Sequence, residues 1–386
     1  MIDKLRSLFR TRAYLGLPTD KRLWIFSSTD NKAFNYNSSY MFKYVVESLP
    51  QITPRYVIND AEKRAELSRE YGEEYFVSTD DDEGLETVMR GGVWFTSAGL
   101  PAYAGGLSRD RLIVNLWHGI PLKRIALLDP QEPAYKKLYF RRIFSRNYTH
   151  VVTTSEEVGK VMAKSLGVDD DKIKIWGQPR CDCLFGEFDA GAFLKERYPD
   201  VPAGSRRILY APTFRSDKPV RLFPFDDFSK EGLERFLEEE DAYIFIRTHS
   251  RETADVEGFV SDRVRLMNAD VAEDVTEVLP LFDMLITDYS SVYIDYMILG
   301  RPMVFLPYDL GDYENKHGFN FPYDDVTPGD KPGDFEEFKA AAGRALRGEF
   351  DTEKLAKAGE LFHEVEGDSC RRIAEAILEE LEDTVQ

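Results

Sequence analysis

The sequence predicts an α/β protein built from two doubly wound, Rossmann-like domains that face a central cleft. Two observations predict this fold class. Short apolar runs typical of strands alternate with helical patterns along the chain, and a segment rich in Gly, Pro and Asp at 186–205 interrupts the alternation once. Such alternation is typical of parallel sheets covered by helices. The length of 386 residues also suits two cores better than one.

Each expected strand is a short run of aliphatic, β-branched or aromatic residues bounded by turn-forming residues. The first half of the chain has seven such runs, at 23–27, 55–57, 75–77, 93–96, 111–116, 150–154 and 173–176. The second half has five, at 208–210, 243–246, 264–266, 284–287 and 303–306.

Helical patterns lie between these runs. One helix is expected to begin with 37–46, and a Thr-x-x-Glu capping box at Thr154 and Glu157 predicts the start of another. The last helix, at 373–384, is acidic and amphipathic, and we expect it to pack back across the first domain. The predicted division is a basic segment at 1–20, domains at 21–185 and 186–370, and a terminal helix at 371–386.

Bulk composition excludes several classes of protein. The net charge of −19 disfavours nucleic acid as a partner, because phosphate-backbone binding needs a basic surface. No apolar run approaches the roughly 20 residues that span a bilayer, and 1–14 lacks the apolar centre of a signal peptide. We therefore expect a cytoplasmic protein. Its three cysteines, Cys181, Cys183 and Cys370, form no disulfide framework and are expected to pack as small hydrophobic residues.

The first twelve residues are basic, although the chain as a whole is acidic. They predict a short helix with an apolar face flanked by basic side chains, namely Ile2, Leu5, Leu8 and Phe9 with Lys4, Arg6, Arg10 and Arg12. Such a helix can lie on an anionic membrane surface, here the cytoplasmic face. The alternative interpretation is a terminal helix packed on its own domain, and both stay open.

The most informative motif runs from Thr287 to Asp309. An apolar run leads to Thr287-Asp288, then Ser290 and Ser291, and helical periodicity follows at once. Hydroxyls and free N–H groups at a helix start favour phosphate. The plain alternative is that one serine only caps the helix. Asp295 lies four residues after Ser291, on the same helical face, where it could accept a hydrogen bond from a ligand hydroxyl or be a surface acid.

Three further motifs follow expected strands. They are Trp117-His118-Gly119 with Lys123, Gly177-Gln178-Pro179-Arg180 with Asp182, and Arg247-Thr248-His249. With these motifs in this order, the chain resembles the CDP-glycerol glycerophosphotransferases, which include teichoic-acid polymerases and primases. The resemblance runs from about residue 21 to the last helix. It implies a GT-B architecture, with an acceptor domain at 21–185 and a CDP-donor domain at 186–370.

The resemblance implies a catalytic role for two histidines. It makes His118 the general base that takes a proton from an attacking hydroxyl, and the flexible Gly119 would let substrate approach the backbone. A structural histidine at a strand end is the alternative. The second is His249, which shares a strand face with Arg247, so that both could meet one phosphate. The chain has Ser250 where the family commonly has proline.

Other cationic and hydroxyl side chains are candidates for binding phosphate. Arg215 ends the segment Tyr210-Ala211-Pro212-Thr213-Phe214-Arg215, which resembles a family motif, and Thr213 could add a hydroxyl. Lys123 could line the acceptor side or be solvated. Arg180 could contact the acceptor or pair with Asp182, and neither reading is preferred.

These residues predict transfer of a polyol phosphate from a CDP-polyol such as CDP-glycerol to a glycan, a lipid-linked saccharide or a teichoic-acid-like polymer, with release of CMP. The donor is a substrate, and no cofactor is expected. The sequence has no metal-binding pattern, no Walker A motif and no G-x-G-x-x-G, which argues against a kinase or a dehydrogenase. The alternatives are a GT-B glycosyltransferase using a nucleotide sugar and a non-catalytic module binding nucleotide or anionic glycan.

Overall fold

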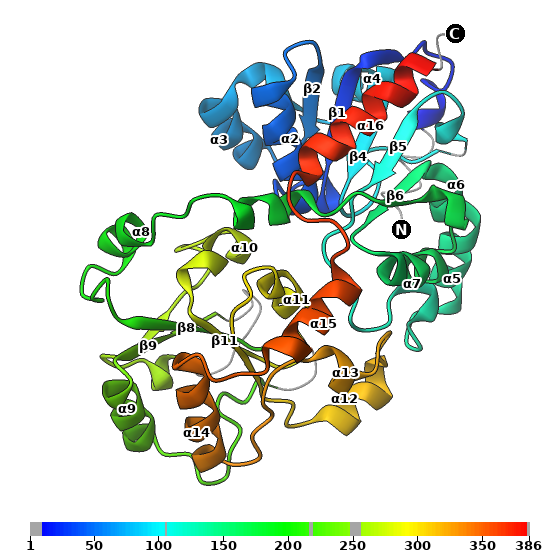
Figure 1. Ribbon diagram of the computed structural model, residues 1–386. Helices are drawn as coiled ribbons and strands as arrows, with labels where there is room; N and C mark the ends of the chain where they lie inside the picture. Colours follow the sequence, from blue (N-terminus) through cyan, green and yellow to red (C-terminus); the bar gives the residue numbers. More distant parts are fainter. Residues whose placement is uncertain (1–9, 105, 216–218, 248–255, 384–386) are drawn as a thin grey trace. The chain divides into compact units, whose positions relative to one another are not determined.

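The computed structural model describes residues 10–104, 106–215, 219–247 and 256–383 (Figure 1). It divides into two compact units. Unit 1 is Met1–Ile120, Ile125–Asp182 and His363–Gln386, and unit 2 is Pro121–Arg124 and Cys183–Phe362. This division differs from the predicted ranges at 121–124 and 183–185, which belong to unit 2, and at 363–370, which belongs to unit 1.

Unit 1 is built on a parallel sheet of seven strands in the order β3-β2-β1-β4-β5-β6-β7. The strands are β1 Asp20–Ser27, β2 Thr53–Val57, β3 Phe76–Val77, β4 Gly91–Thr96, β5 Leu112–Asn115, β6 His150–Thr153 and β7 Ile173–Ile175. Phe26 of β1 pairs with Tyr56 on one side and with Phe95 on the other. The order reverses between β1 and β4, which is the switch point of a doubly wound fold.

Unit 1 contains seven helices that lie wholly within the described residues, of which the last, α16, follows the final strand of the chain. They are α2 Tyr36–Ser48, α3 Ala61–Tyr71, α4 Asp82–Arg90, α5 Ala134–Tyr139, α6 Ser145–Asn147, α7 Glu156–Leu166 and α16 Ser369–Asp383. Shorter turns are the 3₁₀ segments η1 Thr29–Asn31, η2 Glu73–Tyr75, η3 Leu107–Arg109, η4 Ala126–Leu128, η6 Asp170–Lys172 and η7 Pro179–Phe185, and the π-turn η5 Phe140–Phe144.

The core of unit 1 is aromatic and includes the last helix. Phe26, Phe42 and Tyr56 are fully buried in one cluster, and Ile373 and Ile377 of α16 belong to the same cluster. A short apolar stripe therefore suffices to attach a helix from the end of the chain to a sheet formed near its start.

The predicted capping box at Thr154 is wrong by one residue. Ser155 is the N-cap of α7, and its hydroxyl accepts a hydrogen bond from the N–H of Val158 at 3.2 Å. Thr154 is buried one residue earlier, where its carbonyl accepts the N–H of Glu364 at 2.9 Å. The cap must directly precede the first helical residue, and only Ser155 meets that condition.

Unit 2 contains a parallel sheet of five strands in the order β10-β9-β8-β11-β12. The strands are β8 Arg206–Ala211, β9 Ala242–Ile246, β10 Val264–Leu266, β11 Met284–Thr287 and β12 Met303–Phe305. The helices are α8 Ala190–Arg197, α9 Lys230–Glu239, α10 Val275–Val278, α11 Val292–Met297, α12 Leu310–His317, α13 Tyr323–Val326, α14 Phe335–Leu346 and α15 Thr352–Phe362, with 3₁₀ turns η8 Glu257–Phe259 and η9 Leu279–Leu281.

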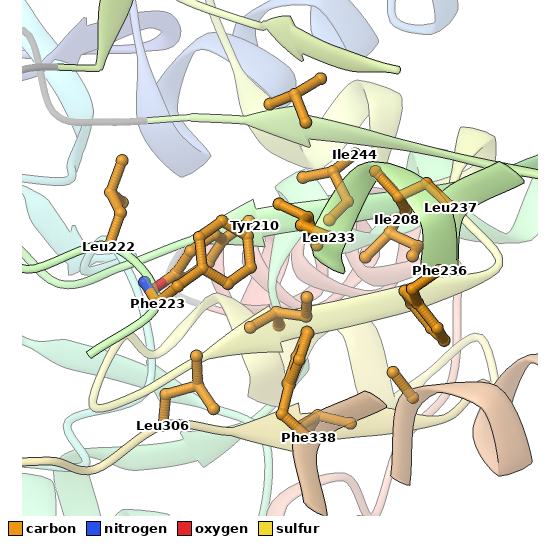
Figure 2. Packing of buried hydrophobic residues seen from close by; sticks show 14 of the residues in the cluster. Ile208, Tyr210, Leu222, Phe223, Leu233, Phe236, Leu237, Ile244, Leu306 and Phe338 are labelled. Carbon is orange, nitrogen blue, oxygen red and sulfur yellow. The ribbon is translucent and has the colours of Figure 1, made fainter. Parts of the chain in front are cut away.

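Figure 2 shows the core of unit 2, in which side chains from strands and helices meet. Ile208 and Ile244 of the sheet are fully buried with Leu237 of α9 and Phe338 of α14. The buried hydroxyl of Tyr210 accepts the N–H of Phe223 at 3.2 Å, so this polar group has a partner inside the core.

All twelve predicted strands are present within a few residues of their expected bounds, and the predicted pair of doubly wound α/β units is confirmed. The predicted linker at 186–205 is not structureless, because it contains α8. Asp189 caps that helix by accepting the N–H of Ala192 at 2.8 Å. The helix escaped prediction because Leu194 is its sole buried residue, which gives almost no apolar periodicity. Among the described residues, no helix has the length and apolar character needed to cross a bilayer.

Candidate active site

His118 stands on a turn whose backbone is held by a buried amide. Directly after β5, Trp117 has a φ of +52° and Gly119 a φ of +146°. A positive φ is uncommon for a residue as bulky as tryptophan. The Asn37 side chain donates to the carbonyls of Leu116 and Trp117, both at 3.0 Å, and accepts the N–H of Arg180 at 3.0 Å. Asn37 is fully buried and so fixes the strained turn that presents the histidine.

The imidazole of His118 is oriented for accepting a proton. Its Nδ1 lies 2.9 Å from the carbonyl oxygen of Ser97. A carbonyl only accepts hydrogen bonds, so Nδ1 carries the proton and Nε2 keeps its lone pair. The ring also stacks on Trp117, with centroids 4.4 Å apart, and lies 5.2 Å from the ring of Tyr36.

Burial lowers the pKa of His118; the bond to Ser97 partly opposes this, and the charge of Arg180 lowers the pKa further. Burial and a neighbouring cation both disfavour the protonated ring. The imidazole is therefore neutral near neutral pH, with Nε2 available as a general base.

Arg180 belongs to the same cluster. It is buried, and its guanidinium donates to the carbonyl of His118 at 2.9 Å. The alternative of a pair with Asp182 is not realised, because the Asp182 carboxylate accepts the N–H groups of Ser369 and Cys370, both at 2.8 Å, at the start of α16. Arg180 thus acts on the backbone and the pKa of His118.

The second group of candidates lies in unit 2, at the carboxyl ends of β8 and β11. The guanidinium of Arg215 is clamped by Asp309, with Nε–Oδ2 at 3.0 Å and Nη2–Oδ1 at 2.8 Å, and Nη2 also lies 2.9 Å from Oδ2 of Asp288. Burial alone would lower the pKa of Arg215, but the two carboxylates raise it, so the side chain is charged. Its charge is met by protein carboxylates.

Thr287 and Asp288 also have protein partners. The Thr287 hydroxyl donates to the carbonyl of Ala211 at 2.6 Å. Oδ1 of Asp288 accepts the N–H groups of Thr213 at 2.8 Å and Tyr289 at 2.6 Å. These bonds join the ends of β8 and β11, which fixes the backbone that carries Thr213.

The other candidate hydroxyls near the carboxyl ends of β8 and β11 are those of Ser290, Ser291 and Thr213. Ser290 and Ser291 are half-buried at the start of α11, and Ser291 makes no side-chain capping bond. The Ser290 hydroxyl lies 3.5 Å from the N–H of Val292, at the limit of a hydrogen bond. The Thr213 hydroxyl is buried and has no hydrogen-bond partner within the described part of the chain.

Asp295 is buried, with 2% of its surface exposed, so the alternative of a surface acid is wrong. The sequence could not decide this, because the same helical position faces solvent or protein depending on what packs against α11. Burial of a carboxylate requires polar neighbours to offset its desolvation.

Arg247 follows β9, and its guanidinium donates to main-chain carbonyls. Nη1 lies 2.7 Å from the oxygen of Ala272, and Nη2 lies 3.0 Å from that of Glu273. Burial lowers the pKa of Arg247, with Asp274 opposing the shift. No carboxylate lies within ion-pair distance of Arg247 among the residues described. His249, predicted beside it, lies outside the described residues.

Lys123 is exposed in the Pro121–Arg124 segment of unit 2, and its ammonium lies 3.4 Å from the Tyr313 hydroxyl. The segment pairs antiparallel with Phe319. Asn320 donates through Nδ2 to the carbonyls of Pro121 at 2.8 Å and Lys123 at 2.9 Å. Asn320 therefore holds the backbone at Pro121, three residues after His118, although Asn320 and Pro121 are 199 positions apart in sequence.

The structure therefore places the predicted residues in two groups. Unit 1 brings together His118, Gly119 and Arg180, and unit 2 brings together Thr213, Arg215, Thr287, Asp288, Ser290, Ser291 and Asp295, with Arg247 on the neighbouring strand. Sequence reasoning missed the partners that hold them, which are Asn37, Ser97, Asp309 and Asn320. Of these, Asp309 was detectable, because it closes the Thr287–Asp309 motif after a predicted strand.

Comparisons with known proteins agree on one family. A family model described as CDP-glycerol:poly(glycerophosphate) glycerophosphotransferase matches residues 9–379. A teichoic acid poly(ribitol-phosphate) polymerase of Bacillus spizizenii is 35% identical over 228 residues, which is 56% of this chain and 35% of the relative. A teichoic acid glycerol-phosphate transferase of Staphylococcus aureus is 26% identical over 340 residues, covering 84% of each protein.

Among solved structures, the wall teichoic acid polymerase TagF shares the fold. The TM-score is 0.76 at 22% identity, covering 100% of this chain and 96% of that chain. The chain spans about a third to a half of the length of the curated polymerases it matches, from 35% to 45%. With a family match over almost its whole length, the chain belongs to the CDP-glycerol:poly(glycerophosphate) glycerophosphotransferase family.

Proposed function

We propose that the protein transfers a polyol phosphate, glycerol phosphate in the simplest case, from a CDP-polyol to a hydroxyl of a glycan, a lipid-linked saccharide or a teichoic-acid-like polymer. CMP is the second product. The observation that carries the proposal is the state of His118, whose Nδ1 proton is held by Ser97 so that Nε2 is free to accept a proton. The named activities of the relatives, polymerisation or transfer of ribitol or glycerol phosphate, support the same chemistry.

In the proposed step, Nε2 of His118 takes the proton of the acceptor hydroxyl, and the oxygen attacks the phosphorus that carries the polyol. The new P–O bond forms the phosphodiester. The bond from that phosphorus to the bridging oxygen breaks, and CMP leaves with the electron pair. Positioning and charge stabilisation supply most of what such a transfer asks of a protein.

The donor phosphates are assigned to the side chains that keep hydrogen-bonding capacity. Arg247 supplies charge, since carbonyls rather than carboxylates surround its guanidinium. Ser290, Ser291 and Thr213 supply hydroxyls. We give Arg215, Asp288 and Thr287 the role of positioning residues, because their polar atoms are bonded to one another or to the backbone. His249 keeps its proposed role beside Arg247, and Asp295 is retained as a ligand for a donor hydroxyl.

On the acceptor side, the proposal places Gly119 and Arg180 around the base, with Lys123 at the margin. The finer proposal on location is peripheral association with the cytoplasmic face of the membrane. Residues 1–9 of the basic segment predicted for this role lie outside the described residues. Arg10 pairs with Asp82 at 3.0 Å and Thr11 is buried, so the described end of the segment packs on unit 1.

The test is release of CMP from CDP-glycerol in the presence of lipid-linked and free glycan acceptors. We expect acceptor-dependent release by the wild type and a loss of at least about a hundredfold in His118→Ala, the usual range for a removed general base. His150→Gln is the matched control. His150 is also a histidine of unit 1, but it contacts Glu380 at 3.0 Å and has no role in the proposed step.

Two results would contradict different parts of the proposal. Turnover that survives His118→Ala overturns the mechanism and keeps the function. No CMP release with any CDP-polyol, but transfer from a nucleotide sugar, overturns the function and leaves the base in place.

A further inference from the structure

Two aromatic residues with a strained backbone lie beside the imidazole of His118. Among the described residues, three aromatic ones have a positive φ, namely Tyr36 at +58°, Trp117 at +52° and Phe223 at +46°. Such a φ is uncommon for a bulky side chain and costs free energy. Phe223 is buried in the core of unit 2, whereas Tyr36 and Trp117 are half-buried in unit 1. Both of their rings lie against the imidazole, so the strain of α2 and the strain of the turn after β5 converge on one side chain.

The polar ends of these two aromatic side chains are available for a ligand. The Tyr36 carbonyl accepts the hydroxyl of Ser39 at 2.8 Å, and the main-chain N–H of Trp117 donates to Asn115 at 2.8 Å. Within the described part of the chain, neither the Tyr36 hydroxyl nor the Trp117 indole N–H has a hydrogen-bond partner. Tyr and Trp side chains packed into a protein usually find a partner for this group. The two rings therefore combine apolar faces with free hydrogen-bonding groups.

A third polar group without a partner lies in the same part of unit 1. Gln178 is 5% exposed, and its Oε1 is buried with no hydrogen-bond partner among the residues described. Together with Trp117 and Gly119, it lines a hollow of about 10 Å³. That volume holds about one water molecule or one hydroxyl group. A buried oxygen without a partner destabilises a fold, so its retention here is explained by a ligand hydroxyl that donates to it.

We propose that Tyr36, Trp117 and Gln178 bind the sugar ring of a saccharide acceptor. A sugar ring holds several C–H groups on one face, so it can lie flat on an aromatic ring while its hydroxyls bond to the phenol, the indole N–H and the buried oxygen. An acyclic polyol reaches such a shape only by losing conformational entropy. The inference rests on the proposed function, and it selects one class among the acceptors named there.

The position beside His118 assigns this site to the acceptor and not to the donor. The base takes its proton from the attacking hydroxyl, so groups that lie against the imidazole lie next to the acceptor. In a CDP-polyol, the ribose and the other phosphate group separate the cytosine from the phosphorus that is attacked. The planar base of the donor is therefore too remote from His118 to be the ring that Tyr36 and Trp117 recognise.

The test measures kcat/KM for CMP release with two kinds of soluble acceptor, a panel of octyl glycosides and an oligomer of glycerol phosphate. Tyr36→Asn and Trp117→Asn each remove one ring, and asparagine tolerates a positive φ better than most residues. We expect each variant to lower the preference for glycosides over the oligomer at least about tenfold. Gln178→Met, which removes the buried oxygen, is expected to lower the same preference by a smaller factor.

The ratio between the two acceptors separates recognition from support of the base. A ring that only holds or shields His118 would affect both acceptors equally and leave the ratio unchanged. Tyr36→Phe keeps the ring and is expected to keep most of the preference. Tyr135→Asn, which removes a 64% exposed ring of unit 1, is the matched control and is expected to behave as the wild type.

Thermal unfolding gives an independent readout. Asparagine relieves the backbone strain at Tyr36 and Trp117, and methionine removes an oxygen without a partner at Gln178. We therefore expect the three variants to unfold at the wild-type temperature or above while they lose acceptor preference, as is common where a site is kept at the expense of stability.

Binding of the octyl glycosides without donor, measured by isothermal titration calorimetry, distinguishes failure of this inference from failure of the proposed function. Glycoside binding that the ring variants weaken, with no CMP release from any CDP-polyol, contradicts the proposed function alone. Three results would overturn the inference: the preference is unchanged in the ring variants, the wild type prefers the oligomer, or the variants lose stability and both activities together.

Discussion

At the scale of single residues, the two groups of candidates achieve their chemistry in opposite ways. His118 is kept neutral by burial and by the nearby charge of Arg180. Arg215 is kept charged by two carboxylates despite its burial. The first arrangement leaves a neutral imidazole that can accept a proton, and the second holds a guanidinium whose charge is balanced by Asp288 and Asp309. A residue's type alone therefore says little about its role until its partners are known.

The link between Arg180 and His118 gives a prediction for the pH dependence of catalysis. The folded pKa of His118 is lowered, so the acidic limb of kcat/KM should lie below the ordinary histidine pKa of about 6.5. In Arg180→Met the lost positive charge makes protonation easier, so the pKa rises and the limb moves to higher pH. Arg180→Lys keeps a charge there and is expected to keep the limb near its original position.

The measurement is kcat/KM for CMP release between pH 4.5 and 8, and its control is the same profile for a variant outside the cluster, Arg235→Gln. A uniform fall in rate at all pH values in Arg180→Met, with the limb unmoved, would reduce Arg180 to a structural support of the His118 carbonyl.

At the scale of secondary-structure elements, the terminal helix α16 shows how an element far along the chain completes a core. Its Ile373 and Ile377 are fully buried among side chains of unit 1. Asp182 holds its first turn by accepting two backbone N–H groups. His150, whose pKa burial lowers to about 4, bonds to Glu380 as a neutral imidazole and ties the last turns to β6.

Truncation of this stripe should destabilise unit 1. We expect Ile373→Ala to lower the free energy of unfolding by about 2–5 kcal/mol, the usual range for a large-to-small change in a core. Glu375→Ala, on the exposed side of the same helix, should change it by less than about 0.5 kcal/mol. Chemical denaturation followed by circular dichroism measures both. Equal effects of the two substitutions would contradict the prediction that burial of this stripe is what stabilises unit 1.

The turn that carries His118 is likewise held by residues that are distant in sequence. Asn37 from α2 fixes the backbone before the histidine, and Asn320 fixes the segment after it. Both asparagines bind main-chain carbonyls, so they determine the path of the chain without touching the imidazole.

At the scale of the whole molecule, the proposed function requires an acidic protein to bind an anionic donor. The net charge of −19 repels phosphates at long range, so the cations of the site have to act locally. In the proposed function, the half-buried Arg247, whose guanidinium is bonded to carbonyls, supplies such a charge. The two Asp triplets of the sequence, 80–82 and 169–171, are exposed, and Asp81 caps α4, so neither is interpreted as the D-x-D site that metal-dependent transferases of another architecture use.

We therefore predict that catalysis does not require a divalent cation. CMP release after exhaustive treatment with EDTA should stay within about twofold of the untreated enzyme. An assay with added Mg²⁺ serves as the control. Activity that disappears with EDTA and returns with Mg²⁺ would contradict the prediction and assign the donor charge to a bound metal.

By itself, the sequence determined the local features of this protein. A short apolar run predicts each strand, and the alternation of these runs with helical patterns predicts two doubly wound units. The motif residues could be found because they follow strands directly. Such signals depend on neighbours within a few positions, and hydrophobic periodicity reports them well.

The tertiary structure alone decided which distant residues meet. Arg215 pairs with Asp309 across 94 positions of sequence, and Asn320 reaches Pro121 across 199. The order of strands in each sheet sets these pairings, and no local pattern encodes that order. For the same reason, the burial of Asp295 and the attachment of 121–124 to unit 2 could be recognised only from the folded structure.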